Sequence, residues 1–235
     1  MGEGPECISN EGCMKKIILV CGVILALAAV ICVSISPNKE AGVKEEQGKI
    51  EQEEKIPLGS EVFISSADPY IGAFVEDGTD EYVENVLSII IENNGSKHIQ
   101  FMNVTIDEKY EFTVSTLLPG TKVLVLEKSR AEYEQGINLD NVVVSNVAFF
   151  GEEPSMHEEL LEISGKDNRI FIKNVSDQTF PGGKVFYKNK FEDKYIGGIT
   201  YTGTIPALEK NETIVLDSVH YQEDSSELMF VTYAE

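Results

Sequence analysis

The residues that could bind a metal ion are concentrated in the acidic segment 76–81, with the sequence EDGTDE. Calcium takes about six to eight oxygen ligands, and a loop containing glycine can bring several carboxylates around one ion. The spacing does not match an EF-hand loop, and in a chain this acidic a solvated turn is the default interpretation. The candidate calcium ligands are Asp77, Asp80 and Glu81.

The candidate recognition stretch is Lys188 to Tyr201, which places three aromatic residues around a glycine pair. Exposed aromatics beside such a pair could contact a sugar or a protein. In the competing interpretation, which we favour, alternate residues face the core and the glycines mark a bulge or a tight bend. The candidate binding residues are Phe191, Tyr195 and Tyr201.

Catalytic residue patterns are missing from this sequence. The histidines, at 98, 157 and 220, are isolated, and no GxSxG or GxxxxGK[ST] pattern occurs. No cysteine follows Cys32, which removes thiol nucleophiles from the C-terminal part. We therefore expect a protein that is not an enzyme and holds no cofactor.

The element that organises the chain is Ile17 to Ile35, an apolar run of 19 residues without a charge. As a helix it would cover about 28 Å, close to the hydrocarbon thickness of a bilayer. Lys15 and Lys16 precede it, so the positive-inside rule places the tail 1–16 in the cytoplasm and the C-terminal part outside. Met14 could instead be the initiator, and the run the core of a signal peptide. Its length and the lack of a clean cleavage site favour an uncleaved, single-pass anchor in the cell membrane.

Charge and composition exclude one class of partner and define a linker. The chain carries 40 acidic and 19 basic residues, a formal net charge of −21, which repels nucleic acid. Residues 36–60 hold no aromatic side chain and ten charges between Lys39 and Lys55. Such a segment buries too little apolar surface to offset its ordering entropy, so we expect a charged linker.

The remainder of the chain predicts an all-β fold. Short runs rich in Val, Ile, Phe and Tyr alternate with Asn, Gly, Asp and Pro, which is typical of antiparallel sandwiches. The predicted strands are 62–64, 82–91, 99–106, 112–117, 123–126, 142–150, 161–163, 170–172, 184–187, 195–204, 213–216 and 228–233.

A weak internal repeat suggests two modules. Ile89 to Ile99 aligns with Ile170 to Phe180 at a separation of 81 residues. A second pair of segments, beginning at Leu118 and Leu208, aligns at a separation of 90. The nine additional residues of the second copy would form a longer hairpin within Phe191 to Thr204.

Two tandem sandwiches account for this repeat better than one large fold. We expect module 1 at 61–150 and module 2 at 156–235. The boundary between them is the acidic segment 151–155, which contains a proline.

The second copy also carries a resemblance to a known family. IKNVSDQTF, GKVFYKN and IPALEKNETIVL, within Ile170 to Leu216, resemble the FxLYD-type immunoglobulin-like modules of bacterial surface proteins. A fainter likeness covers Ile89 to Val125. Lys188-Asn189 stands where such a module would show Leu-Tyr-Asp spacing. The resemblance implies an immunoglobulin-like β-sandwich without enzymatic activity.

These observations together predict a membrane-anchored, extracytoplasmic interaction module on a bacterial cell surface. It would serve an envelope assembly or adhesion system and bind an envelope protein or the cell wall. The alternative is a ligand- or calcium-responsive sensor or solute-binding accessory. An envelope hydrolase would need paired carboxylates or a nucleophile that the sequence does not reveal.

Overall fold

The computed structural model describes residues 55–233, and every regular element in that range is a β-strand. The strands are β1 (Ile56–Gly59), β2 (Val62–Phe74), β3 (Glu81–Asn93), β4 (Ile99–Ile106), β5 (Tyr110–Leu117), β6 (Lys122–Leu126), β7 (Val142–Phe149), β8 (Leu161–Lys166), β9 (Arg169–Asn174), β10 (Gly183–Phe191), β11 (Lys194–Ile205), β12 (Thr213–Asp217) and β13 (Ser226–Tyr233). The predicted all-β class is confirmed, and each predicted run overlaps a strand, although β2 extends ten residues beyond the predicted 62–64.

One strand lies where the sequence predicted a linker. β1 occupies Ile56–Gly59, inside the segment 36–60, and pairs antiparallel with β2. The linker prediction is therefore wrong for these residues. A strand of four residues with one proline is too short to show an alternating pattern, and its pairing with β2 establishes it.

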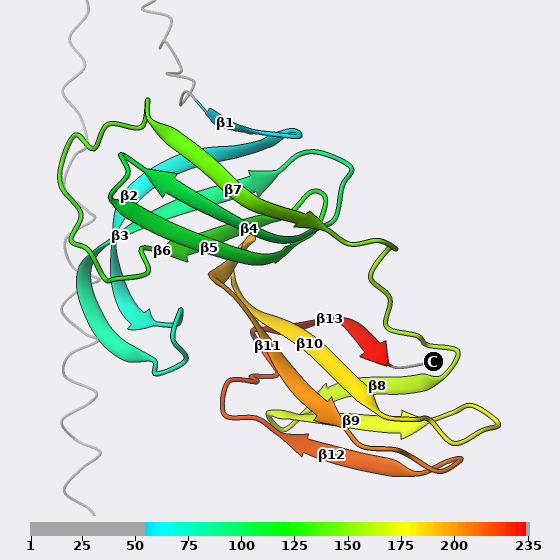
Figure 1. The fold of residues 1–235 in the computed structure, drawn as a ribbon. Coiled ribbons are helices and arrows are strands. Elements are labelled where there is room, and N and C mark those ends of the chain that lie inside the picture. The colour runs from blue at the N-terminus through cyan, green and yellow to red at the C-terminus, as the bar shows by residue number, and fades with distance from the viewer. Residues whose placement is uncertain (1–54, 234–235) are drawn as a thin grey trace, which may run out of the picture. The chain divides into compact units, whose positions relative to one another are not determined.

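The strands form three sheets that pack face to face (Figure 1). A seven-stranded sheet has the order β1-β2-β3-β6-β11-β10-β13. The sheet β5-β4-β7 packs on its first four strands, and the sheet β12-β9-β8 packs on its last three. We call residues 55–150 the first half and residues 156–233 the second half.

Alternation of side chains builds the two main cores. Along β4, Met102, Val104 and Ile106 are buried while the residues between them are less so. This is the period-two pattern of a strand with one face on a core. The second half has its own core, which includes Ile170 and Ile172 of β9. Burying each such side chain contributes roughly 1.5–3 kcal/mol, so apolar contact is the main source of stability.

Two buried asparagines make the same hydrogen bonds in the two halves. The Asn93 side-chain amide donates to the carbonyl oxygens of Lys97 (2.9 Å) and Leu117 (3.0 Å). The Asn174 amide donates to Gln178 O (2.7 Å) and Leu208 O (2.9 Å). In each case the acceptor four residues later fixes the turn that follows the strand. The second acceptor ties that turn to the end of β5 in the first half and to the loop between β11 and β12 in the second.

The strand registers of the two halves are also equivalent. Ile91 pairs with Val123 in the first half as Ile172 pairs with Ile214 in the second, which gives separations of 81 and 91 residues. The second separation is 91 residues where the sequence predicted 90, because the alignment of that segment was off by one residue. The ten additional residues extend the tip of the β10–β11 hairpin, beyond the Tyr187–Tyr201 pair.

No helix within residues 55–233 is long and apolar enough to cross a bilayer. The predicted tail 1–16 and the predicted membrane-spanning run Ile17–Ile35 lie outside the described residues.

Candidate functional site

The acidic loop between β2 and β3 directs its carboxylates at cationic and hydrogen-bonding partners within the chain. Asp77 accepts hydrogen bonds from the Thr79 amide (3.0 Å) and hydroxyl (2.6 Å). Arg130 donates to Asp77 through Nη2 (2.8 Å) and to Glu81 through Nη1 (2.5 Å). The bonds from Thr79, followed by the Arg130 guanidinium, lower the pKa of Asp77 to about 2.

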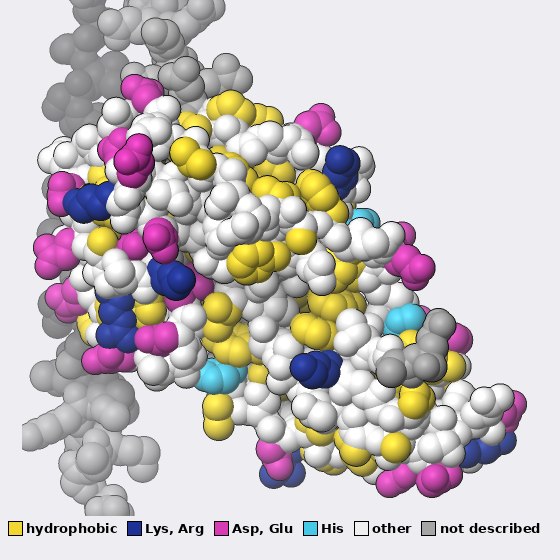
Figure 2. All heavy atoms as spheres, viewed as in Figure 1, with side chains coloured by type: hydrophobic (Ala, Val, Ile, Leu, Met, Phe, Trp, Pro, Cys, Tyr) yellow, Lys and Arg dark blue, Asp and Glu magenta, His cyan; other side chains and the backbone are white. Residues whose placement is uncertain are grey.

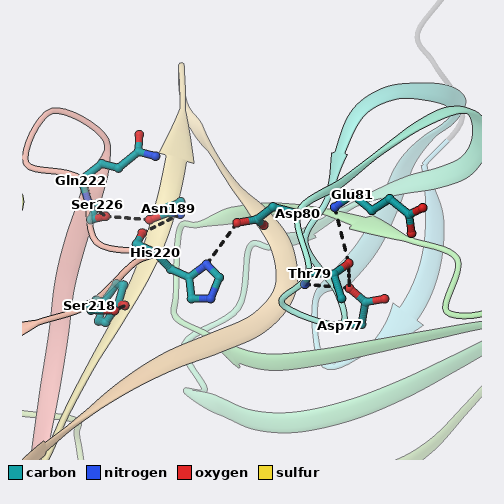
Figure 3. A network of polar contacts seen from close by, with 10 residues as sticks. Asp77, Thr79, Asp80, Glu81, Asn189, Ser218, His220, Gln222 and Ser226 are labelled. Atoms are coloured by element: carbon teal, nitrogen blue, oxygen red, sulfur yellow. Dashed lines mark hydrogen bonds and ion pairs between the residues drawn. The ribbon is translucent and has the colours of Figure 1, made fainter.

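The third predicted calcium ligand, Asp80, points toward the second half (Figure 3). Its Oδ2 atom lies 3.2 Å from Nδ1 of His220, in the loop between β12 and β13. Asn189 holds that loop by donating to the His220 carbonyl oxygen (3.1 Å). Among residues 55–233 no three His, Cys, Asp or Glu side chains are gathered as a metal site. The calcium site stays a prediction without support from this geometry.

Glu76 joins two strands of the seven-stranded sheet. Its Oε1 accepts from the amides of Leu126 in β6 (2.8 Å) and Gly198 in β11 (2.9 Å), and Oε2 lies 3.0 Å from the same Gly198 nitrogen. Just before Leu126 and Gly198 in the sequence, β6 and β11 pair directly in parallel. Where the two strands diverge, the carboxylate takes the place of a backbone acceptor. Burial raises the pKa of Glu76, while these amide hydrogen bonds act in the opposite direction.

Lys188 lies beside Glu76 with no exposed surface. Its Nζ donates to the carbonyl oxygens of Gly197 (3.1 Å), Gly198 (3.2 Å) and Ile199 (2.7 Å). Burial lowers the pKa of Lys188 to about 7, and the nearby Glu76 carboxylate partly opposes this. We call the contact between β6, Glu76 and the β10–β11 hairpin tip the joint.

The glycine pair permits the close approach that the joint requires. A Cβ atom on Gly198 would lie 1.8 Å from the Thr113 carbonyl oxygen of β5, and Gly197 has a φ of +84°. The Ser115 hydroxyl also donates to the Gly198 carbonyl oxygen (2.9 Å). These glycines therefore mark a close strand contact, in agreement with the interpretation favoured from the sequence.

The three predicted binding aromatics do not form one surface. Tyr195 is 3% and Tyr201 9% exposed, whereas Phe191 is 59% exposed at the hairpin tip. Tyr195 belongs to the core of the first half, and Tyr201 stacks on His220 with ring centroids 4.6 Å apart. Of the three, Phe191 alone presents its ring to solvent.

Three exposed apolar side chains form a row on β7, Val143, Val147 and Phe149, which sequence reasoning did not single out. Val143, Val147 and Phe149 are 51%, 44% and 38% exposed, and Lys97 Nζ lies 4.8 Å from the Phe149 ring centroid. Hydrophobic side chains are visible over this sheet in Figure 2. The sequence of β7 is rich in valine and predicts a strand, but the pattern does not tell which face of that strand is covered.

A polar hollow of about 150 Å³ adjoins this apolar row at Ser145. Its polar lining comes from β4, β5, β7 and the loop after β6, and includes Asn103, Thr105, Thr113 and Ser145 with the charged Glu111 and Lys128. Thr113 donates to Asn103 across the strands (3.0 Å). The face therefore offers apolar contact beside hydroxyl, amide and charged groups, a combination suited to binding.

Comparison of this chain with protein-family models, with curated proteins and with solved structures finds no match.

Proposed function

We propose that the chain is a non-catalytic interaction module, anchored in the cell membrane by Ile17–Ile35 and displayed outside the cytoplasm. Its partner is an envelope protein or the cell wall, as in an assembly or adhesion system. The observation that carries this proposal is the exposed apolar row Val143, Val147 and Phe149 on β7. Three such side chains on one strand gain free energy when a partner covers them, roughly 25 cal/mol per Å² of apolar surface.

The proposal includes two tandem immunoglobulin-like sandwiches. Its support is the shared strand pairing of the two halves: β6-β3-β2 with β5-β4-β7, and β12-β9-β8 with β11-β10-β13. The equivalent hydrogen bonds at Asn93 and Asn174 add to that support. Duplication of one sandwich accounts for both observations.

The test is photo-crosslinking in live cells from a benzoylphenylalanine at Val147. The matched control carries the same group at Tyr82 of β3, which is 66% exposed and lies outside the apolar row. We expect a discrete envelope adduct from Val147, little from Tyr82, and loss of the adduct in Val143→Lys with the melting temperature unchanged. Equal adducts from both positions, or recovery of the protein in the soluble cytoplasm, would contradict the proposal.

A further inference from the structure

β6 and β12 are equivalent strands, one in each half. Each follows a turn with a residue at positive φ, Gly120 (+73°) before β6 and Asn211 (+63°) before β12. The amide of that residue donates to the main-chain carbonyl of the buried asparagine, over 2.7 Å to Asn93 and 3.0 Å to Asn174. Each strand then pairs antiparallel, over five positions and without a shift, with β3 or β9.

The outer edge of β6 is occupied by a strand from the other half. Val123 and Leu124 pair in parallel with Tyr195 and Ile196 of β11. Lys122, at the start of β6, forms an ion pair with Asp193 in the β10–β11 turn (3.2 Å). This chain therefore already uses strand addition at that edge to join two parts of its fold.

The equivalent edge of β12 has no strand on it among the described residues, since β12 ends the sheet β12-β9-β8. Val215 is the counterpart of Leu124 and is 42% exposed, while Val219, just beyond the strand, is 90% exposed. Leu124, by contrast, packs with Ile196 in an apolar cluster. Leu124, which is packed with Ile196 of β11 against the cluster of Phe74, Val75, Val86 and Leu126, thus has an exposed counterpart in the second half.

β12 is short, at five residues, but it lacks the irregularities and internal charges that protect the other sheet edges. Register shifts interrupt the pairing of β1, β7 and β13, and β8 carries a charge inside the strand, Glu162, as well as Lys166 at its end. Such irregularities and charges discourage the addition of a further strand. β12, with the sequence TIVLD, is regular, has three aliphatic residues in a row and carries its one charge at the end.

We infer that the outer edge of β12 binds an extended strand of a protein partner, added in parallel as β11 is added to β6. The partner strand presents an aromatic and an aliphatic residue followed by small residues, like Tyr195-Ile196-Gly197-Gly198. Main-chain hydrogen bonds supply the affinity, and contact with Val215 sets the register. This surface is separate from the β7 row on which the proposed function rests.

The first half shows which amide groups face the partner. The Glu127 amide donates inward to Leu87 of β3 (2.8 Å), and the preceding Leu126 amide donates outward to Glu76. Because alternate amides of a strand point to the same side, the Leu124 amide also points away from β3. The amide of its counterpart Val215 points away from β9 in the same way. Val215→Pro removes this outward donor and leaves the pairing with β9 in place.

The probe is a fluorescein-labelled peptide with the sequence of residues 191–200, FEDKYIGGIT, titrated with the full-length protein in detergent micelles. We expect saturable binding by anisotropy, weakened at least about tenfold by Val215→Pro, the loss expected when one main-chain hydrogen bond and its neighbours fail. Val215→Thr is the matched control, because it keeps the amide and the side-chain shape. Val147→Lys, on the β7 row, should leave peptide binding unchanged.

A second measurement tests the inference even if Val215→Pro fails to fold. The four native cysteines are first replaced by serine. Val215→Cys in that chain should then form a disulfide with a peptide in which cysteine replaces the isoleucine that corresponds to Ile196. Val175→Cys, at a site with a similar exposure of 40%, should not. No peptide binding up to about 1 mM, binding unaffected by Val215→Pro in a folded protein, or equal disulfide yields at the two positions would overturn the inference.

Discussion

Replacing Gly198 with alanine should open the joint between the two halves. The new Cβ atom would lie 1.8 Å from the Thr113 carbonyl oxygen and 2.9 Å from Val125 Cγ1, so the main chain of β11 must move away from β5. Overpacking of this kind costs about 1–3 kcal/mol. The movement also breaks the hydrogen bond from the Gly198 amide to the Glu76 carboxylate, and a bond to a charged group contributes about 1.5–3 kcal/mol.

We therefore expect Gly198→Ala to lower the free energy of unfolding by about 3 kcal/mol or more. At about 2–4 °C per kcal/mol for a chain of this size, the melting temperature should fall by about 6–12 °C. Circular dichroism of the full chain measures this. Gly151→Ala is the matched control, since its Cβ meets nothing within 4 Å and its φ is not positive. A Gly198→Ala melting temperature within about 2 °C of that control would refute the argument from close packing.

Burial lowers the pKa of Lys188 from 10.5 to about 7, so between these pH values the unfolded chain binds more protons than the folded chain. Urea titrations should show the free energy of unfolding rising from pH 7 to 10.5, by roughly 4–5 kcal/mol. Lys188→Met should remove that rise. The same pH dependence of the free energy of unfolding in both proteins would contradict the lowered pKa of Lys188. Asn93→Ala and Asn174→Ala should each cost about 2–3 kcal/mol, because each leaves buried carbonyl groups unpaired, and the double variant should show the sum within about 0.5 kcal/mol. Calcium should shift the melting temperature by less than about 1 °C, since Arg130 already neutralises Asp77; a larger shift that Asp77→Ala abolishes would establish the calcium site instead.

The local pattern of the sequence was sufficient to place most strands. Valine- and isoleucine-rich runs bounded by Asn, Gly and Pro predict strands because both the runs and the turns act over a few residues. β1 was missed for the same reason, since its four residues carry no pattern and their pairing with β2 decides their structure. The repeat was detectable because Asn93 and Asn174 occupy equivalent turns, and the alignment failed by one residue where loop lengths differ.

The candidate sites were harder to predict. The glycine pair in Lys188 to Tyr201 indicated a bend, and the structure places a close strand contact there. The sequence did not reveal that Tyr195 is buried while Phe191 is exposed, because both lie in one hairpin of mixed charge. The acidic loop has the composition of a calcium site, but Arg130, more than 50 residues away from Asp77, pairs with it.

The sequence by itself determined that the C-terminal part is all-β, where most strands lie and that the pattern occurs twice. Those properties depend on side chains and turns a few residues apart. Only the tertiary structure decided that the longer hairpin of the second half inserts against the first, with Glu76 bound to Gly198 across 122 residues. It also decided that the edge of β6 is covered while that of β12 is open. Which edges and charges become buried depends on packing between segments distant in sequence, and no local pattern encodes that.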